Sequence, residues 1–419
     1  MPEKNKNVCF IGVLLLLILL LIIFSQPIWA MDTTQKIIYN SSYSLDNQKI
    51  DHTVTFKIDY LQEIINDIYL QGDLIIRATN KNYADPLIMG PNELYLNAYN
   101  IIENLDLRAG IIVTRWGAAD FFSPLDNFNP SPPNLSLTSN TEKLGAMGIN
   151  ATYYLNDSTN LQAVLLPALK ATPFPDQYLK DTYLAQYGPF YQKQGITISG
   201  VELSYQQPEE LIWGLELNHT FPSFDIGLSY YHGYYTDPFP VNLDIAFNPA
   251  GNIMDLTLGY PAKQVWGLEF QGDFPGIEGA TLRGDLAYII PEKWSFQGVN
   301  ILEKPYLKAV VSADYTTPSD IYLNGGFIYG LPFENQGQCS PYLYLHADKK
   351  LTNSNFTPQY TCVLSLKDMS MGNVLGLDYQ ISENVLASFS YVFVLGDTDS
   401  RLGILKPSEG FYFSLEWLF

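Results

Sequence analysis

A period-two alternation of apolar and polar residues runs through most of the chain after residue 30. It is clear in the segments 224–230, 265–271, 281–288 and 377–381. Successive side chains of a β-strand point to opposite faces, so each segment places Leu, Ile, Val, Phe, Tyr and Trp on one face and polar residues or Gly on the other. The pattern predicts an all-β protein.

Turn signals divide this pattern into twenty candidate strands. The weakest three begin near Lys36, Pro341 and Tyr360. The full set begins near Lys36, Asp51, Asn66, Asn92, Leu105, Leu144, Asn160, Ile196, Leu211, Phe224, Asn252, Lys263, Ala280, Lys304, Asp320, Pro341, Tyr360, Asn373, Asn384 and Glu409. Bacterial barrels have even strand numbers, so we expect 16, 18 or 20 strands.

A transmembrane barrel explains this pattern better than a soluble sandwich. A sandwich buries one face of each strand against a second sheet, and a chain of 419 residues would then need several domains. No linker or shift in composition marks a boundary. An antiparallel up-and-down barrel over residues 31–419 turns its apolar face to lipid, and Tyr pairs such as Tyr230-Tyr231 resemble interfacial aromatic girdles.

The first 30 residues have the order of an export signal. Lys4 and Lys6 precede an apolar run from Val8 to Phe24, and Ala30 lies at the expected cleavage site. An uncleaved anchor is the alternative, because the run is near the minimum length for spanning a bilayer. The rest of the chain has no comparable apolar run, which excludes a helical bundle of the inner membrane.

The chain ends on an aromatic residue with no tail after it. Apolar side chains occupy every second position of the last segment: Phe411, Phe413, Leu415, Trp417 and Phe419. This ending looks like the insertion signal of bacterial outer-membrane barrels, and it implies recognition by the barrel-insertion machinery. An ordinary closing strand is the alternative. Together with the export signal, the aromatic ending predicts a location in the bacterial outer membrane, in contact with the lipid and lipopolysaccharide of that membrane.

One segment, residues 115–130, departs from the strand pattern. It reads R-W-G-x-x-D-x-x-x-P-x-D-x-x-N-P, and its marked residues are Arg115, Trp116, Asp120, Phe121, Phe122, Asp126, Asn129 and Pro130. Gly and Pro take the chain out of the sheet here, and the Phe side chains are too apolar for a loop in water. The run resembles a segment of uncharacterised porin-like families of Gram-negative bacteria, including alginate-export-like barrels. The likeness covers 16 of 419 residues and supports the architecture more than any substrate.

The position of this segment makes it a candidate constriction. It follows the fifth candidate strand, which runs outward from a periplasmic N-terminus, so it forms the third external loop. In general porins that loop folds inside and narrows the pore, and we expect the same of residues 116–133. A rigid plug with no role in selectivity is the alternative.

Catalysis finds little support in the sequence. The four His side chains lie in no recognisable arrangement with Ser or Asp, and no phosphate-binding loop or Cys pair at metal spacing is present in the sequence. We therefore expect no enzyme, cofactor or metal. A net charge of −20 argues against nucleic-acid binding. Cys339 and Cys362 are an even pair in an exported chain, which predicts a disulfide, with two separate thiols as the alternative.

The remaining function is passage of solutes through the lumen. Alternation assigns nine charged residues to the lumen wall, where opposed charges filter by charge and dipole. They are Asp106, Arg108, Asp225, Glu269, Arg283, Asp285, Lys308, Asp314 and Asp378. We expect passive diffusion of small polar solutes with weak cation preference, in a barrel that is a candidate homo-trimer. A specific transporter for hydrophobic compounds or oligosaccharides, or a structural surface barrel, remains open.

Overall fold

The computed structural model describes residues 32–81, 85–132, 142–247, 249 and 251–419. The predicted export signal, residues 1–30, lies outside this range. Among the described residues, no helix has both the length and the hydropathy needed to cross a bilayer.

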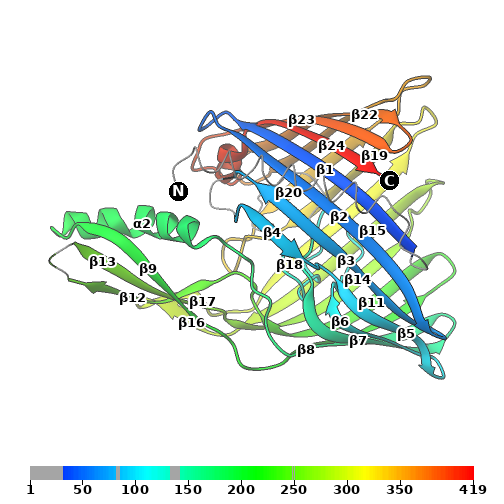
Figure 1. The fold of residues 1–419 in the computed structure, drawn as a ribbon, viewed down its shortest axis with the longest axis horizontal. Helices are drawn as coiled ribbons and strands as arrows, with labels where there is room; N and C mark the ends of the chain where they lie inside the picture. The colour runs from blue at the N-terminus through cyan, green and yellow to red at the C-terminus, as the bar shows by residue number, and fades with distance from the viewer. Residues whose placement is uncertain (1–31, 82–84, 133–141, 248, 250) are drawn as a thin grey trace.

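The fold is a closed antiparallel barrel of 18 strands (Figure 1). Each strand pairs with the next barrel strand, and the last strand pairs with the first, from Lys36↔Leu418 to Ser44↔Gly410. The strands are β1 (Asp32–Ser44), β2 (Ile50–Ile65), β3 (Ile68–Thr79), β5 (Leu94–Ile102), β6 (Leu105–Ile112), β7 (Ala146–Asn156), β8 (Thr159–Leu166), β10 (Ile212–Thr220), β11 (Phe224–Tyr234), β14 (Ala262–Asp273), β15 (Ala280–Pro291), β18 (Tyr306–Thr316), β19 (Tyr322–Tyr329), β20 (Pro341–Asp348), β21 (Phe356–Ser365), β22 (Met371–Ser382), β23 (Val385–Leu395) and β24 (Gly410–Leu418).

The fourth barrel strand is broken. β5 pairs with the first half of β3, and the short β4 (Leu87–Gly90) pairs with its second half. Pro91 lies between β4 and β5 and has no N–H for the ladder, so a break is expected here.

The alternation predicted from the sequence sets the two faces of the barrel. On β10, Trp213, Leu215 and Leu217 are each about 40% exposed, whereas Glu216 between them is 5% exposed. On β24, Phe411, Phe413 and Trp417 are likewise exposed, and they alternate with Tyr412, Ser414 and Glu416. An apolar outer face and a polar inner face are typical of membrane barrels.

Eighteen of the twenty predicted strands belong to the barrel, including the three weakest. The two exceptions, near Ile196 and Asn252, are β9 (Ile198–Gln206) and β13 (Asn252–Gly259), which form a separate sheet with β12 (Phe239–Ala246). β9 runs parallel to β13. Residues 207–211 connect this sheet to β10.

A helix, α2 (Asp176–Lys193), packs on this three-stranded sheet. Met254, Leu256 and Leu258 alternate on β13 and are at most 1% exposed, in a cluster that includes Leu179 of α2. We call α2, β9, β12 and β13 the outer unit. Figure 1 shows it projecting from one end of the barrel. A small hairpin of β16 (Trp294–Phe296) and β17 (Val299–Leu302) and a 3-10 helix, η1 (Gly403–Ser408), complete the described elements.

The two ends of the barrel differ in their connections. Residues 66–67, 103–104, 157–158 and 383–384 make short turns at the end that holds the start of β1 and the end of β24. The long connections 113–145, 167–211, 235–261 and 292–305 lie at the opposite end, with the outer unit. Short turns on the periplasmic side and long loops outside are typical of outer-membrane barrels.

The predicted disulfide is not formed, because both cysteines are free thiols. Cys339 lies in the connection between β19 and β20, and Cys362 lies within β21 opposite Asn373. Val363, next to Cys362, is buried on the inner face, so the side chain of Cys362 faces the other way. Burial raises the pKa of the Cys339 thiol, although Lys308 opposes this.

Candidate functional site: the inner loop and the lumen wall

The connection after β6 enters the barrel. We call its residues 113–132 the inner loop; Pro133, the predicted end of the constriction, lies outside the described residues. Asn129 closes the base of this loop, because its Nδ2 donates to the carbonyls of Ile112 and Leu144 and its Oδ1 accepts from the Thr114 N–H at 2.8 Å. One amide thus joins both strands that carry the loop.

Aromatic packing fixes the first part of the inner loop against the wall. The Trp116 ring meets Phe128 edge-on with centroids 4.7 Å apart, and Phe128 meets Tyr231 of β11 at 5.1 Å. The Trp116 indole N–H donates to the side chain of Gln162 on β8. Trp116 and Phe128 are at most 3% exposed, so this contact is a small core inside the barrel.

Two aspartates hold the middle of the loop. Asp285 of β15 is 2% exposed and accepts from the backbone N–H groups of Ala118, at 2.9 Å, and Ala119, at 3.1 Å. In the loop itself, Asp120 pairs with Arg283 and accepts from Asn324 Nδ2 at 2.9 Å. Hydrogen bonds to a charged partner are the stronger kind, so these contacts hold the loop firmly.

The far part of the loop reaches the wall made by β18 to β23. Phe121 stacks on Tyr344 of β20 with centroids 5.1 Å apart. Phe121 and Phe122 both pack on a buried cluster that includes Val310 and Ile328. The loop therefore follows the inner wall from β8 to β20.

The return part of the loop rests on two lysines. Lys143 lies 3.2 Å from the Asp126 carboxylate, and Lys263 of β14 donates to Asn127 at 2.7 Å. Burial raises the pKa of Asp126, and the charge of Lys143 opposes this. Pro130 is buried, and its carbonyl accepts from Leu144 N–H. Arg115 and Asp120 are the exposed members of the predicted set.

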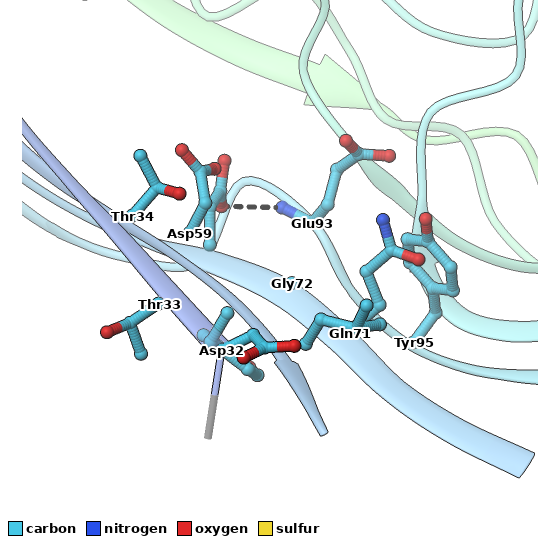
Figure 2. Close-up of a pocket in the computed structure, with 11 residues that line it drawn as sticks. Asp32, Thr33, Thr34, Asp59, Gln71, Gly72, Glu93 and Tyr95 are labelled. Atoms are coloured by element: carbon cyan, nitrogen blue, oxygen red, sulfur yellow. Dashed lines mark hydrogen bonds between the residues drawn. The ribbon is translucent and has the colours of Figure 1, made fainter. Parts of the chain in front are cut away.

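An acidic recess lies beside the base of the inner loop, where the Val113 N–H donates to the Glu93 carboxylate at 3.1 Å. It has a volume of about 380 Å³ and is bordered by β1, β2, β3 and β5. Figure 2 shows Asp32, Asp59, Glu93 and Tyr95 around this recess. Asp73 is structural there, because it accepts from the N–H groups of Asn92 and Glu93 at the break between β4 and β5. Lys57 lies 2.9 Å from Asp59 and 3.3 Å from Asp73.

The nine predicted wall residues have different surroundings, although strand register places all of them on the inner face. Glu269, Arg283 and Asp285 lie beneath or beside the inner loop, and Asp314 is 3.4 Å from Arg283. Lys308 donates to two backbone carbonyls, Leu331 and Pro332. Asp106 bonds to Tyr154, Asp378 accepts from Gln359, Arg108 lies 6.0 Å from the Tyr95 ring, and Asp225 is exposed. Within the described ranges, no group of three His, Cys, Asp or Glu side chains is arranged to hold a metal ion.

Sequence reasoning missed the residues that receive the loop. A Cβ atom on Gly214 would lie 2.6 Å from Trp116 and 2.9 Å from Phe128, and one on Gly267 would lie 2.7 Å from Leu125. The signal was present in the alternation, because Gly occupies inward positions on β10 and β14 and leaves room there for the side chains of the loop. Leu125, which is 1% exposed, and Asn324 were also not predicted.

Removing the carboxylate of Asp285 tests how firmly the loop is held. We expect Asp285→Ala to lower the free energy of unfolding by roughly 2–4 kcal/mol, because two buried N–H groups lose a charged acceptor. The matched control is Asp225→Ala, an exposed inner-face carboxylate on β11, with an expected change below about 0.5 kcal/mol. Urea titration of the detergent-solubilised barrel measures both. Equal effects would show that Asp285 does not hold the loop.

The fold and the apolar outer face define a transmembrane β-barrel. Among solved structures, the chain is similar to OccK11 (OpdR) of Pseudomonas aeruginosa, with 12% identity, a TM-score of 0.53, and coverage of 93% of this chain and 96% of that one. It is similar to OpdL of the same organism, with 10% identity, a TM-score of 0.54, and coverage of 93% and 98%. At these identities the likeness to both structures is one of fold. No protein-family model and no curated protein sequence matches the chain.

Proposed function

We propose that this protein is an outer-membrane channel through which small polar solutes diffuse, with the inner loop as its constriction. The observation that carries the proposal is the placement of this loop. It is held to the wall from β8 to β20, and it leaves the polar recess of β1, β2, β3 and β5 on the inner face. A loop that narrows a polar lumen filters solutes by size and charge.

The proposed channel prefers cations weakly. Most basic side chains of the inner wall are neutralised: Arg283 lies between Asp120 and Asp314, and Arg77 pairs with Glu142 at 3.0 Å. Carboxylates outnumber bases around the recess. Asp32, Asp59, Asp73 and Glu93 lie there with two bases, Lys57 and Arg108, the latter 6.0 Å from the Tyr95 ring. The excess negative charge raises the local concentration of cations.

Reversal potential under a salt gradient tests this selectivity. In a planar bilayer we expect steady channel openings and a reversal potential whose sign indicates selectivity for cations. Neutralising the recess with Asp59→Asn and Glu93→Gln should move that potential toward zero, whereas Asp157→Asn, in the short turn between β7 and β8, should leave it unchanged. A folded barrel without openings would contradict the channel and favour the hydrophobic-substrate or structural alternatives.

The same proposal includes the partners expected from the sequence. The outer apolar band would contact membrane lipid, the end with the long loops would meet lipopolysaccharide, and β24 would be recognised by the insertion machinery. A homo-trimer stays a prediction. Chemical cross-linking of the protein in native membranes tests it directly.

A further inference from the structure

A second cavity lies where the outer unit joins the barrel. Its volume is about 200 Å³. Three aromatic side chains line it, Phe174 before α2, Tyr205 of β9 and Tyr260 after β13. Tyr260 also belongs to the buried cluster that holds the inner loop, and Leu179, a further lining residue, belongs to the core of the outer unit.

The polar groups of this cavity are acidic or neutral. Asp176 accepts from the Tyr205 hydroxyl at 2.7 Å, and Gln207 and Thr172 complete the polar lining. Asp237, next to the lining residue Pro238, accepts from Thr172 at 2.6 Å. The lining residues include no Lys, Arg or His. Burial, followed by the bond to Asp176, raises the pKa of Tyr205, so its hydroxyl stays neutral and keeps donating.

We propose that this cavity binds a small alkylammonium group, such as the trimethylammonium group of choline. Aromatic rings attract cations through the negative faces of their π systems, and quaternary ammonium ions are recognised by such aromatic cages. The carboxylate of Asp176 adds the opposite charge without a competing base, and the net charge of −20 favours the approach of cations. The cavity is smaller than the roughly 300–1,000 Å³ of sites for drug-sized ligands, which fits a single head group.

This site is separate from the proposed constriction. It lies at the end of the barrel with the long connections, and it would hold a cationic solute before that solute enters the lumen. The proposal does not rest on conduction, because binding is measurable on the solubilised protein. Failure to bind and failure to conduct are therefore separate results.

The test compares choline with its neutral carbon isostere, in which a tert-butyl group replaces trimethylammonium. Saturation-transfer NMR titrations use the whole protein in a detergent without a charged head group. We expect choline to bind at least about tenfold more tightly than the isostere. Equal binding of the two would overturn the proposal, because it would reduce the cavity to an apolar pocket. Displacement of choline by glucose would also overturn it, in favour of a sugar site.

Variants locate the site. Tyr205→Leu removes a ring and Asp176→Asn removes a charge, and each should weaken choline binding about tenfold. Tyr205→Phe keeps the ring, so it should bind choline more tightly than Tyr205→Leu does. Binding by Tyr205→Phe would also show that β9 is intact. Phe190→Leu is the matched control, because Phe190 is an exposed aromatic residue of α2 that does not line the cavity. Native affinity in both Tyr205→Leu and Asp176→Asn would overturn the assignment.

Discussion

Replacing residues 117–127 of the inner loop by a three-residue Gly-Ser-Gly linker should raise single-channel conductance at least twofold. The design keeps Trp116 and Phe128, whose rings are 4.7 Å apart, so the linker joins two residues that already pack on each other. It also keeps the hydrogen bonds of Asn129 at the loop base. Since the removed residues follow the wall from β8 to β20, their loss widens the lumen over this arc.

The same replacement should weaken cation preference. Asp285 loses the two backbone N–H groups that donate hydrogen bonds to it. Arg283 loses its partner Asp120 but keeps Asp314 at 3.4 Å. Glu269, beside the backbone of Gly117, becomes exposed to the solution in the lumen. The replacement also removes Asp120 and Asp126 and leaves Lys143 and Lys263 without their side-chain partners on the loop. The reversal potential should therefore move away from the cation direction, because two carboxylates are lost and more bases than carboxylates are uncovered.

A matched replacement controls for shortening a connection. The turn between β20 and β21, residues 349–355, lies at the end that holds the start of β1 and the end of β24, and it takes the same linker. We expect the conductance of this control variant to equal that of the native protein. If the inner-loop variant assembles as a barrel and also conducts like the native protein, the inner loop does not line the path of the ions.

The architecture was predictable from the sequence because one physical pattern dictates it. Lipid outside and polar groups inside impose alternation on every barrel strand, and this alternation identified even the weak strands near Pro341 and Tyr360. The same pattern failed near Ile196 and Asn252. There α2 covers one face of a small sheet, and Met254, Leu256 and Leu258 alternate toward that helix rather than toward lipid. Alternation reports that one face is apolar, but not what covers it.

The candidate site was predictable only on the loop side. Gly, Pro and Phe in residues 115–130 indicated a loop that leaves the sheet and avoids water, and their local chemistry depends on neighbours in sequence. The wall residues that bind the loop are distant in sequence. Asp285 and Asn324 bind Ala118 and Asp120 across more than 160 positions of the chain. Such pairs depend on the closure of the barrel and the depth of the loop, which no local pattern encodes. The inward-facing glycines Gly214 and Gly267 are the sequence feature that reflects this packing.

Deleting Phe419 should leave most of the protein in the periplasm. The backbone N–H of Phe419 donates to Gln35 at 2.9 Å, and its carbonyl accepts from Gln35 N–H at 3.1 Å. Its side chain is 37% exposed on the outer face, next to the Trp417 ring at 5.2 Å. Two backbone hydrogen bonds contribute only about 1 kcal/mol each, so their loss cannot unfold a barrel of this size. A large assembly defect would therefore report recognition of the terminal aromatic residue.

Two substitutions separate recognition from stability. Phe419→Ser keeps both backbone hydrogen bonds but removes the ring, so we expect it to accumulate in the periplasm like the deletion. Phe419→Tyr keeps a ring and should assemble normally. Cell fractionation measures the location of each variant, and refolding into detergent micelles, where no insertion machinery acts, should be equally efficient for all of them. Normal membrane assembly of Phe419→Ser would show that β24 is an ordinary closing strand, because the ladder to β1 would then be sufficient.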